Sequence, residues 1–179
     1  MITLIHGGMR AGLCLEAANQ LAKILREHGK AFKLFDLRKI QFNYCCGDQP
    51  CQESGNCIYN DVITNEIIPT VAESDAVVIF TPTYFNAPPA VLKNFMDRCN
   101  LLLTIETRKR SKFLTWISGQ TESDDESRKD NRKCLVTFAE ICEFNIAEGN
   151  IMRAAEDIVQ TQLCEADLVK LDFFAKEIL

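Results

Sequence analysis

The sequence has no apolar run close to the ~20 residues that a helix needs to cross a bilayer, and it has no surplus of positive charge. Its 20 Lys and Arg are outnumbered by 25 Asp and Glu, which gives a net charge of -5 at pH 7. Because contacts to nucleic-acid phosphates require clustered Lys and Arg, we expect neither a membrane protein nor a nucleic-acid-binding protein. Met1 runs directly into Ile2-Thr3-Leu4-Ile5 without a charged leader, so we expect a cytoplasmic protein.

The chain also lacks the residues of a catalytic triad. With only two histidines, His6 and His28, no Ser-His-Asp or Cys-His arrangement can be assembled, and we interpret both histidines as structural. Trp116 lies within an apolar run and is expected in the core, whereas Asp97 and Arg98 are expected to form a local ion pair. The nine cysteines are odd in number and nothing indicates an oxidising compartment, so we expect reduced thiols.

Apolar runs and amphipathic segments alternate along the chain. Its 179 residues, 47% of them hydrophobic, suit one domain over residues 1–179. Strands are predicted at 2–5, 31–35, 76–80 and 113–117, with a less regular one at 144–152. Helices are predicted from Cys14 to Leu25, at 61–73, 89–102 and 126–143, and in the C-terminal segment. The alternation favours an α/β fold, a three-layer doubly wound five-stranded parallel sheet with helices on both faces.

A glycine-rich turn, His6 to Cys14, joins the first strand to the first helix. Its three glycines let the backbone approach a ligand, the helix N-terminus offers a positive dipole end, and Arg10 adds charge, so a phosphate would fit there. The spacing matches neither the Walker loop nor Gly-x-Gly-x-x-Gly, which lowers support for ATP and for a direct NAD site. An ordinary glycine-rich turn without a ligand is the alternative.

A second loop, Thr81 to Pro89, follows the third strand. In a doubly wound sheet the ligand crevice lies at the carboxyl ends of the strands where the winding reverses, and this loop is expected in that crevice. Tyr84 and Phe85 could face a flat ring there. The alternative is that these aromatic residues belong to the core under a loop.

With these two loops the chain resembles flavodoxin-like NAD(P)H-dependent FMN reductases, including their iron-sulfur flavoprotein branch. The resemblance covers nearly the whole length and is carried by Gly7 to Cys14, Gly55 to Asp61, Ser74 to Phe85 and Leu92 to Arg98. It implies the flavodoxin-like strand order 2-1-3-4-5 and an FMN site at the carboxyl edge of the sheet. The implied FMN contacts are Gly8, Met9, Arg10, Gly12, Leu13 and Cys14 around the phosphate, Pro82, Thr83, Tyr84, Phe85 and Asn86 along the ribityl chain and ring, and the loop Ser118-Gly119-Gln120-Thr121 at the ring edge.

The resemblance further implies an FMN-dependent oxidoreductase that takes hydride from NAD(P)H and reduces a flavin, a quinone or another small acceptor. The flavin would carry the chemistry, so no catalytic side chain is expected. A homodimer or higher homo-oligomer is implied, and residues 101–103, three leucines, would form part of its apolar patch unless they are core. Two alternatives stay open: a flavodoxin-type electron carrier between protein partners, and a non-enzymatic scaffold with a decayed flavin site.

The first loop departs from the family pattern. Relatives usually show Gly-Ser-Pro-Arg followed by hydroxyl and amide donors, whereas this chain has Gly8, Met9 and Cys14. A hydrogen bond to a charged group contributes roughly 1.5–3 kcal/mol, so we expect FMN to be retained with weaker affinity.

Four cysteines, Cys45, Cys46, Cys51 and Cys57, lie in one short loop and could suit an iron-sulfur cluster, which needs four converging ligands. The iron-sulfur branch has Cys-x2-Cys-x2-Cys-x5-Cys, and here Asp48 stands where the second cysteine belongs. Zinc would prefer paired Cys-x2-Cys spacing. We therefore expect no metal and interpret the loop as a relic or a redox-sensitive surface.

Overall fold

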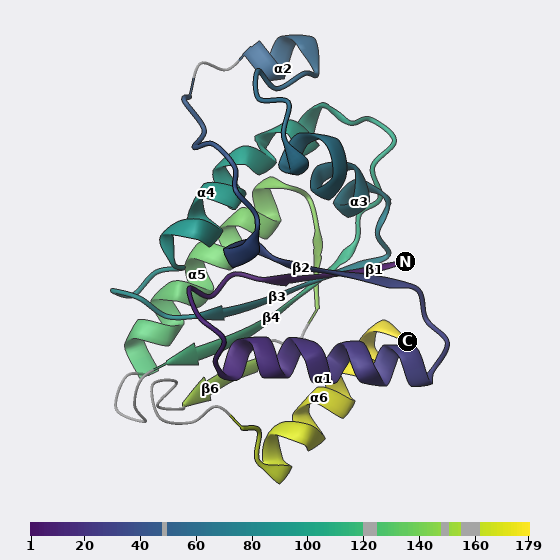
Figure 1. Ribbon diagram of the computed structural model, residues 1–179, viewed down its shortest axis with the longest axis vertical. Coiled ribbons are helices and arrows are strands. Elements are labelled where there is room, and N and C mark those ends of the chain that lie inside the picture. The colour runs from purple at the N-terminus through teal and green to yellow at the C-terminus, as the bar shows by residue number, and fades with distance from the viewer. Residues whose placement is uncertain (48–49, 120–124, 148–150, 155–161) are drawn as a thin grey trace.

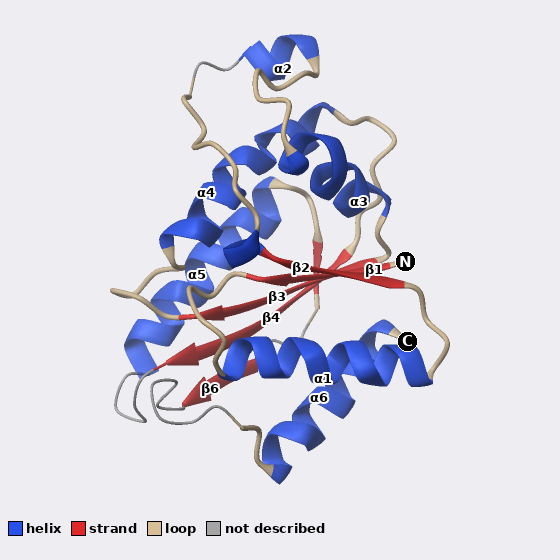
Figure 2. Ribbon diagram, viewed as in Figure 1, coloured by secondary structure: helices blue, strands red, loops and turns tan. Residues whose placement is uncertain are grey.

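The sheet is entirely parallel. The computed structural model describes residues 1–47, 50–119, 125–147, 151–154 and 162–179. Its strands are β1 (Ile2–His6), β2 (Phe32–Asp36), β3 (Ala76–Pro82), β4 (Lys112–Gly119), β5 (Asn145–Ile146) and β6 (Ile151–Ala154). They run in the order β2-β1-β3-β4-β5, with β6 also paired to β4 (Figure 2). The predicted α/β fold and the order 2-1-3-4-5 are confirmed.

The fifth position of the sheet is shared by two short strands. Lys112 and Phe113 at the start of β4 pair with β5, and the segment from Trp116 to Gly119 pairs with β6. The predicted strand 144–152 is therefore divided between β5 and β6, and Gly149 lies outside the described residues.

Helical segments connect the strands. The α-helices are α1 (Leu13–Glu27), α2 (Pro50–Ser54), α3 (Ile68–Glu73), α4 (Ala90–Arg98), α5 (Asp125–Ile141) and α6 (Glu165–Ile178). A π-helical turn, Ile63–Ile67, leads into α3, and 3₁₀ turns occupy Leu37–Lys39 and Cys99–Thr104. The predicted helices at 61–73 and 89–102 thus each combine two helical forms. Among the described residues, no helix is both long and apolar enough to cross a membrane.

The helices cover both faces of the sheet (Figure 1). On one face α3, α4 and α5 pack against alternate strand residues such as Val77 and Ile79, and on the other α1 and α6 pack against Val78 and Phe80. Trp116 is fully buried in this second core, as predicted. Because β3 is buried on both faces, its sequence is continuously apolar from Ala76 to Phe80.

Helix α1 shows why the local pattern could be predicted. Its apolar residues Ala17, Ala18, Leu21 and Leu25 recur at three- and four-residue steps, and all are fully buried against the sheet. Gly29 follows the C-cap residue His28, and its φ of +65° is the left-handed conformation that glycine adopts without a steric penalty.

Candidate functional site

Two loops meet at the carboxyl edge of the sheet because β1 and β3 are parallel neighbours. The first follows β1 and the second follows β3, and the backbone N–H of Gly7 donates to the carbonyl oxygen of Phe80 at 2.8 Å. The ladder thus continues into the first loop. The third loop follows β4, whose last two residues are Ser118 and Gly119, and Gln120 and Thr121 lie outside the described residues.

The first loop leaves no room for side chains at its two leading glycines. A Cβ on Gly7 would lie 2.7–2.9 Å from side-chain atoms of Leu92, and a Cβ on Gly8 would lie 2.7 Å from Nε2 of His6. Both glycines are buried, and the loop becomes exposed at Met9 and Arg10. This backbone segment, the glycine cradle, therefore accepts only glycine, because Leu92 and His6 pack directly against it.

His6 forms the floor of this cradle. Its ring is fully buried, and Nδ1 lies 3.0 Å from Oδ1 of Asp36, whose carboxylate also accepts from Nε of Arg38 at 2.9 Å. Burial alone would raise the pKa of Asp36, but hydrogen bonds and charge from Arg38 and His6 reverse this and lower it to about 2. The expectation that His6 is structural agrees with these contacts.

We predict that Asp36→Asn lowers the free energy of unfolding at neutral pH by about 2 kcal/mol, the value of the pKa shift. Because the folded-state pKa lies below the ordinary 3.8, this stability is present above that value and is lost as pH falls toward about 2. Urea unfolding across pH should show the two proteins converging over that interval. Asp97→Asn, at a half-exposed ion pair, is the control and should change little. A difference that persists below pH 2 would contradict the assignment.

The first loop leads directly into α1. The N-cap residue of this helix is Gly12, which has no side chain of its own to cap the first turn, and the positive end of the helix dipole lies here. Leu13 and Cys14 are buried, and Sγ of Cys14 lies 3.1 Å from Oγ of Ser118 at the end of β4. Cys14 therefore links the first loop to the end of β4.

The second loop contains a tight turn. The backbones of Tyr84 and Ala87 exchange hydrogen bonds of 2.9 and 3.0 Å, while Phe85 and Asn86 between them have φ of +49° and +61°. Phe85 is completely exposed and Tyr84 is 40% exposed. The alternative that both aromatic residues belong to the core is therefore wrong. Strained, exposed backbone of this kind is concentrated at functional sites.

Helix α5 holds the second loop in place. The fully buried Asn131 donates from Nδ2 to the carbonyl oxygen of Pro82 at 3.2 Å and to Oγ1 of Thr83 at 3.0 Å. Asn86 donates to Oδ2 of Asp130 at 3.2 Å. Sequence reasoning missed both α5 residues, because they lie in a charge-dense segment that is typical of a solvated helix start.

A clamp closes the cysteine loop. The buried Arg98 donates to the carbonyl oxygen of Asn43 at 3.0 Å, to both carboxylate oxygens of Asp61 at 2.8 and 3.0 Å, and to Oγ1 of Thr64 at 2.9 Å. It also lies over the ring of Tyr59, 4.9 Å from the centroid. One guanidinium thus joins the two ends of the loop.

This geometry corrects the predicted pairing of Asp97 with Arg98. Asp97 instead pairs with Lys93, one turn back on α4. Burial alone would lower the pKa of Arg98, but Asp61 outweighs it and the pKa is raised, with a smaller contribution from Cys57. Burial likewise opposes ionisation of Asp61, yet Arg98 lowers its pKa.

The four thiols of the loop line one small cavity beside Arg98. Its volume is about 20 Å³, which is room for about one water molecule. Cys45 and Cys46 are exposed and Cys51 and Cys57 are half-buried. Among the described residues, no three His, Cys, Asp or Glu side chains converge as metal ligands, and Asp48 lies outside them. As placed, these thiols do not fit an iron-sulfur cluster.

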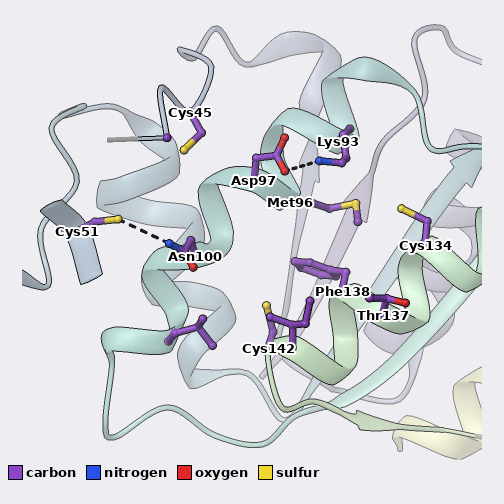
Figure 3. A pocket seen from close by; sticks show the side chains of 13 residues that line it. Cys45, Cys51, Lys93, Met96, Asp97, Asn100, Cys134, Thr137, Phe138 and Cys142 are labelled. Carbon is purple, nitrogen blue, oxygen red and sulfur yellow. Dashed lines mark hydrogen bonds and ion pairs between the residues drawn. The ribbon is translucent and has the colours of Figure 1, made fainter. Parts of the chain in front are cut away.

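A larger groove of about 520 Å³ lies between α4 and α5, outside the two glycine and aromatic loops (Figure 3). Apolar side chains such as Met96, Phe138 and Ile141 form much of its wall, and Cys45 and Cys51 line the end that the cysteine loop covers. Of the three leucines 101–103, Leu101 and Leu102 are core and Leu103 is exposed beside this groove.

Comparison with known proteins gives one family match. The family described as NADPH-dependent FMN reductase matches residues 1–121. An iron-sulfur flavoprotein of Clostridioides difficile is 29% identical over 135 residues, which are 66% of this chain and 60% of that protein. One from Methanocaldococcus jannaschii is 36% identical over 87 residues, 48% of this chain and 42% of that protein. The chain therefore matches less than two thirds of the length of either relative.

Solved structures share the fold at low sequence identity. An azoreductase from Bacillus anthracis has a TM-score of 0.70 at 13% identity, over 99% of this chain and 97% of that one. A flavodoxin of Streptococcus pneumoniae has a TM-score of 0.64 at 16% identity, over 99% and 97% of the two chains. These likenesses identify the fold alone.

Proposed function

The chain belongs to the family of NADPH-dependent FMN reductases, and from this premise we propose that it is an oxidoreductase that holds FMN at the carboxyl edge of its sheet, takes hydride from NAD(P)H and reduces a flavin, a quinone or a similar small acceptor. The observation that carries the proposal is the cradle of Gly7 and Gly8, which lies between the glycine N-cap of α1 and the exposed turn after β3. A cytoplasmic location and a homodimer remain predictions.

The first loop would hold the phosphate of FMN. Gly8 and Gly12 bring the backbone close, the start of α1 supplies a positive dipole end, and the exposed Arg10 supplies charge. In the same loop the side chain of Met9 is half exposed, whereas Leu13 and Cys14 at its end are buried.

The second and third loops would face the ring. When bound, FMN accepts a hydride and passes on one or two electrons. Pro82 and Thr83 are fixed by Asn131, which orients the turn that presents Tyr84 and Phe85. Ser118 and Gly119 would lie at the ring edge. The chain's own residues bind and orient, and none of them transfers a proton in this scheme.

Phe85→Gly tests whether the strained turn serves the ligand. Relief of the left-handed penalty, about 1–2 kcal/mol, opposes the entropic cost of glycine, about 0.5–1 kcal/mol, so we expect the free energy of unfolding to stay equal or rise slightly. Loss of an aromatic contact should lower turnover of an aromatic acceptor about fivefold. Denaturant unfolding and steady-state kinetics measure the two effects. Full activity in this variant would show that Phe85 has no part in acceptor binding.

The function is tested by the visible spectrum of the purified protein under anaerobic conditions, before and after NADPH. Yellow protein that NADPH bleaches, and that an added quinone reoxidises, supports the reductase. Yellow protein that responds to dithionite but not to NADPH would instead identify an electron carrier. Colourless protein that added FMN leaves unchanged would contradict both and identify the scaffold.

A further inference from the structure

Two of the four loop thiols share one environment. Cys51 and Cys57 are both half-buried, both pack against the core on the α4 side of the sheet, and both line the small inner cavity. Cys45 and Cys46 line that cavity as well, but they are exposed and belong to no core cluster of the described residues. The inner pair is therefore the one that packing holds in place.

Each of the two thiols also has a polar neighbour from the helical segment that starts at α4. Nδ2 of Asn100 donates to Sγ of Cys51 at 4.0 Å, as Figure 3 shows, and Arg98 interacts with Cys57. These contacts hold the two thiols in position, and in disulfide exchange a thiolate is the nucleophile. Because Arg98 also binds Asn43 and Asp61, it closes the loop that contains both thiols.

Cys51 has access to the outside through the larger groove. Of the inner pair, Cys51 lines both the inner cavity and the groove of about 520 Å³ between α4 and α5, as the exposed Cys45 also does, whereas Cys57 lines the inner cavity alone. That volume is in the range of small-molecule sites, and the walls at Met96, Phe138 and Ile141 suit an apolar or aromatic body. A ligand in the groove would meet Cys51, with Cys57 behind it.

We propose that Cys51 and Cys57 form a redox-active dithiol that reduces small aromatic disulfides bound in this groove. The thiolate of Cys51 attacks one sulfur of the disulfide, the S–S bond breaks, and the first thiol leaves with a proton from solvent. The thiolate of Cys57 then attacks Sγ of Cys51, forms the Cys51–Cys57 disulfide and releases the second thiol. The dithiol loses two electrons and the ligand gains them, so no further reactant is needed.

This activity does not depend on FMN. It also gives the cysteine loop a role. The relatives are named iron-sulfur flavoproteins, but the cysteines of this chain, as placed, do not fit an iron-sulfur cluster. If the dithiol activity is absent, the proposed reductase function is unaffected, and if the reductase function is absent, the dithiol proposal is unaffected.

The probe is 5,5′-dithiobis(2-nitrobenzoic acid), an aromatic disulfide whose thiol product is coloured, at one equivalent to the full-length protein. The background is a triple variant, Cys45→Ser, Cys46→Ser and Cys164→Ser, which removes the exposed thiols. We expect two coloured thiols per protein, no retained adduct, and a link between Cys51 and Cys57. Trypsin with Glu-C locates the link by mass spectrometry, since cleavage after Glu53 separates the two cysteines.

Further substitutions in this background define the order of attack. Cys57→Ser should release one coloured thiol and keep the adduct on Cys51. Cys134→Ser, at a half-buried thiol on α5 that lines the same groove, is the matched control and should release two. One thiol released with an adduct on Cys51 or Cys134 in the background protein would overturn the proposal.

The wild-type protein provides an independent test that involves no substitution. Mapping after one equivalent of probe should find Cys51 linked to Cys57, and a link from Cys45 or Cys46 to either residue in its place would refute the assignment. Anaerobically purified protein with roughly four irons per chain would also overturn it, because the thiols would then be ligands.

Discussion

Arg98→Met is expected to lower the free energy of unfolding by about 3–5 kcal/mol, because it leaves a largely buried carboxylate without its partner. The guanidinium makes four hydrogen bonds, two of them to Asp61, and its side chain is 1% exposed. Methionine keeps much of the aliphatic volume, so the loss reports the ionic contacts rather than a cavity. The ends of the cysteine loop, at Asn43 and Asp61, should separate as a result.

Urea unfolding of the wild type and the variant measures this loss. Lys93→Met is the matched control, since it breaks an ion pair on the same helix whose side chains are about half exposed, and it should cost less than about 1 kcal/mol. Thiol alkylation gives a second readout, because an opened loop should make Cys57 react faster in the Arg98 variant alone. Equal losses from the two substitutions would show that Arg98 is not a clamp.

Gly8→Val is expected to weaken FMN binding by about 10- to 100-fold. Its Cβ would lie 2.7 Å from Nε2 of His6, and that ring is held by Asp36 and cannot simply move aside. The loop backbone must therefore move, and the loss of one hydrogen bond from it to the phosphate removes roughly 1.5–3 kcal/mol, where each 1.4 kcal/mol is tenfold in affinity.

Fluorescence titration with FMN measures the affinity, and unfolding without flavin shows whether the variant is folded. Gly29→Ala is the control: its φ of +65° makes a side chain strained, but it lies at the far end of α1. It should lose stability and keep its FMN affinity. Unchanged FMN affinity in a folded Gly8→Val variant would show that the phosphate of FMN does not bind to this loop.

The sequence predicted the centre of the sheet closely. The runs 76–80 and 113–117 fall within β3 and β4, because strands buried on both faces are largely apolar. The parallel arrangement then placed the first and second loops at one edge. The fifth position was predicted as one strand and is formed by two, since β5 and β6 pair with different halves of β4.

The missed features depend on residues far apart in the chain. Asn131 supports Pro82 and Thr83 from a helix that begins more than 40 residues later, and nothing in its neighbourhood distinguishes it from a solvated residue. From the sequence, Arg98 is predicted to form an ion pair with Asp97 because the two residues are adjacent in the chain. Only the folded chain shows that Asp61 approaches from the other side.

Cys14 illustrates the same limit at the site itself. From the sequence it stands where relatives have a hydroxyl or amide donor for the phosphate. In the fold it is buried against Ser118, so it stabilises the meeting of the first and third loops. Backbone groups and Arg10 are therefore left as the principal means of holding an anion in the first loop.

The most direct test of the phosphate site compares the affinity of the purified protein for FMN and for riboflavin, which lacks the phosphate. If the glycine cradle and the start of α1 hold the phosphate, FMN should bind one per chain and at least about tenfold more tightly than riboflavin, because a single hydrogen bond to a charged group contributes roughly 1.5–3 kcal/mol. Equal affinity for the two flavins, or no binding of either, would contradict a phosphate site between Gly8 and Cys14.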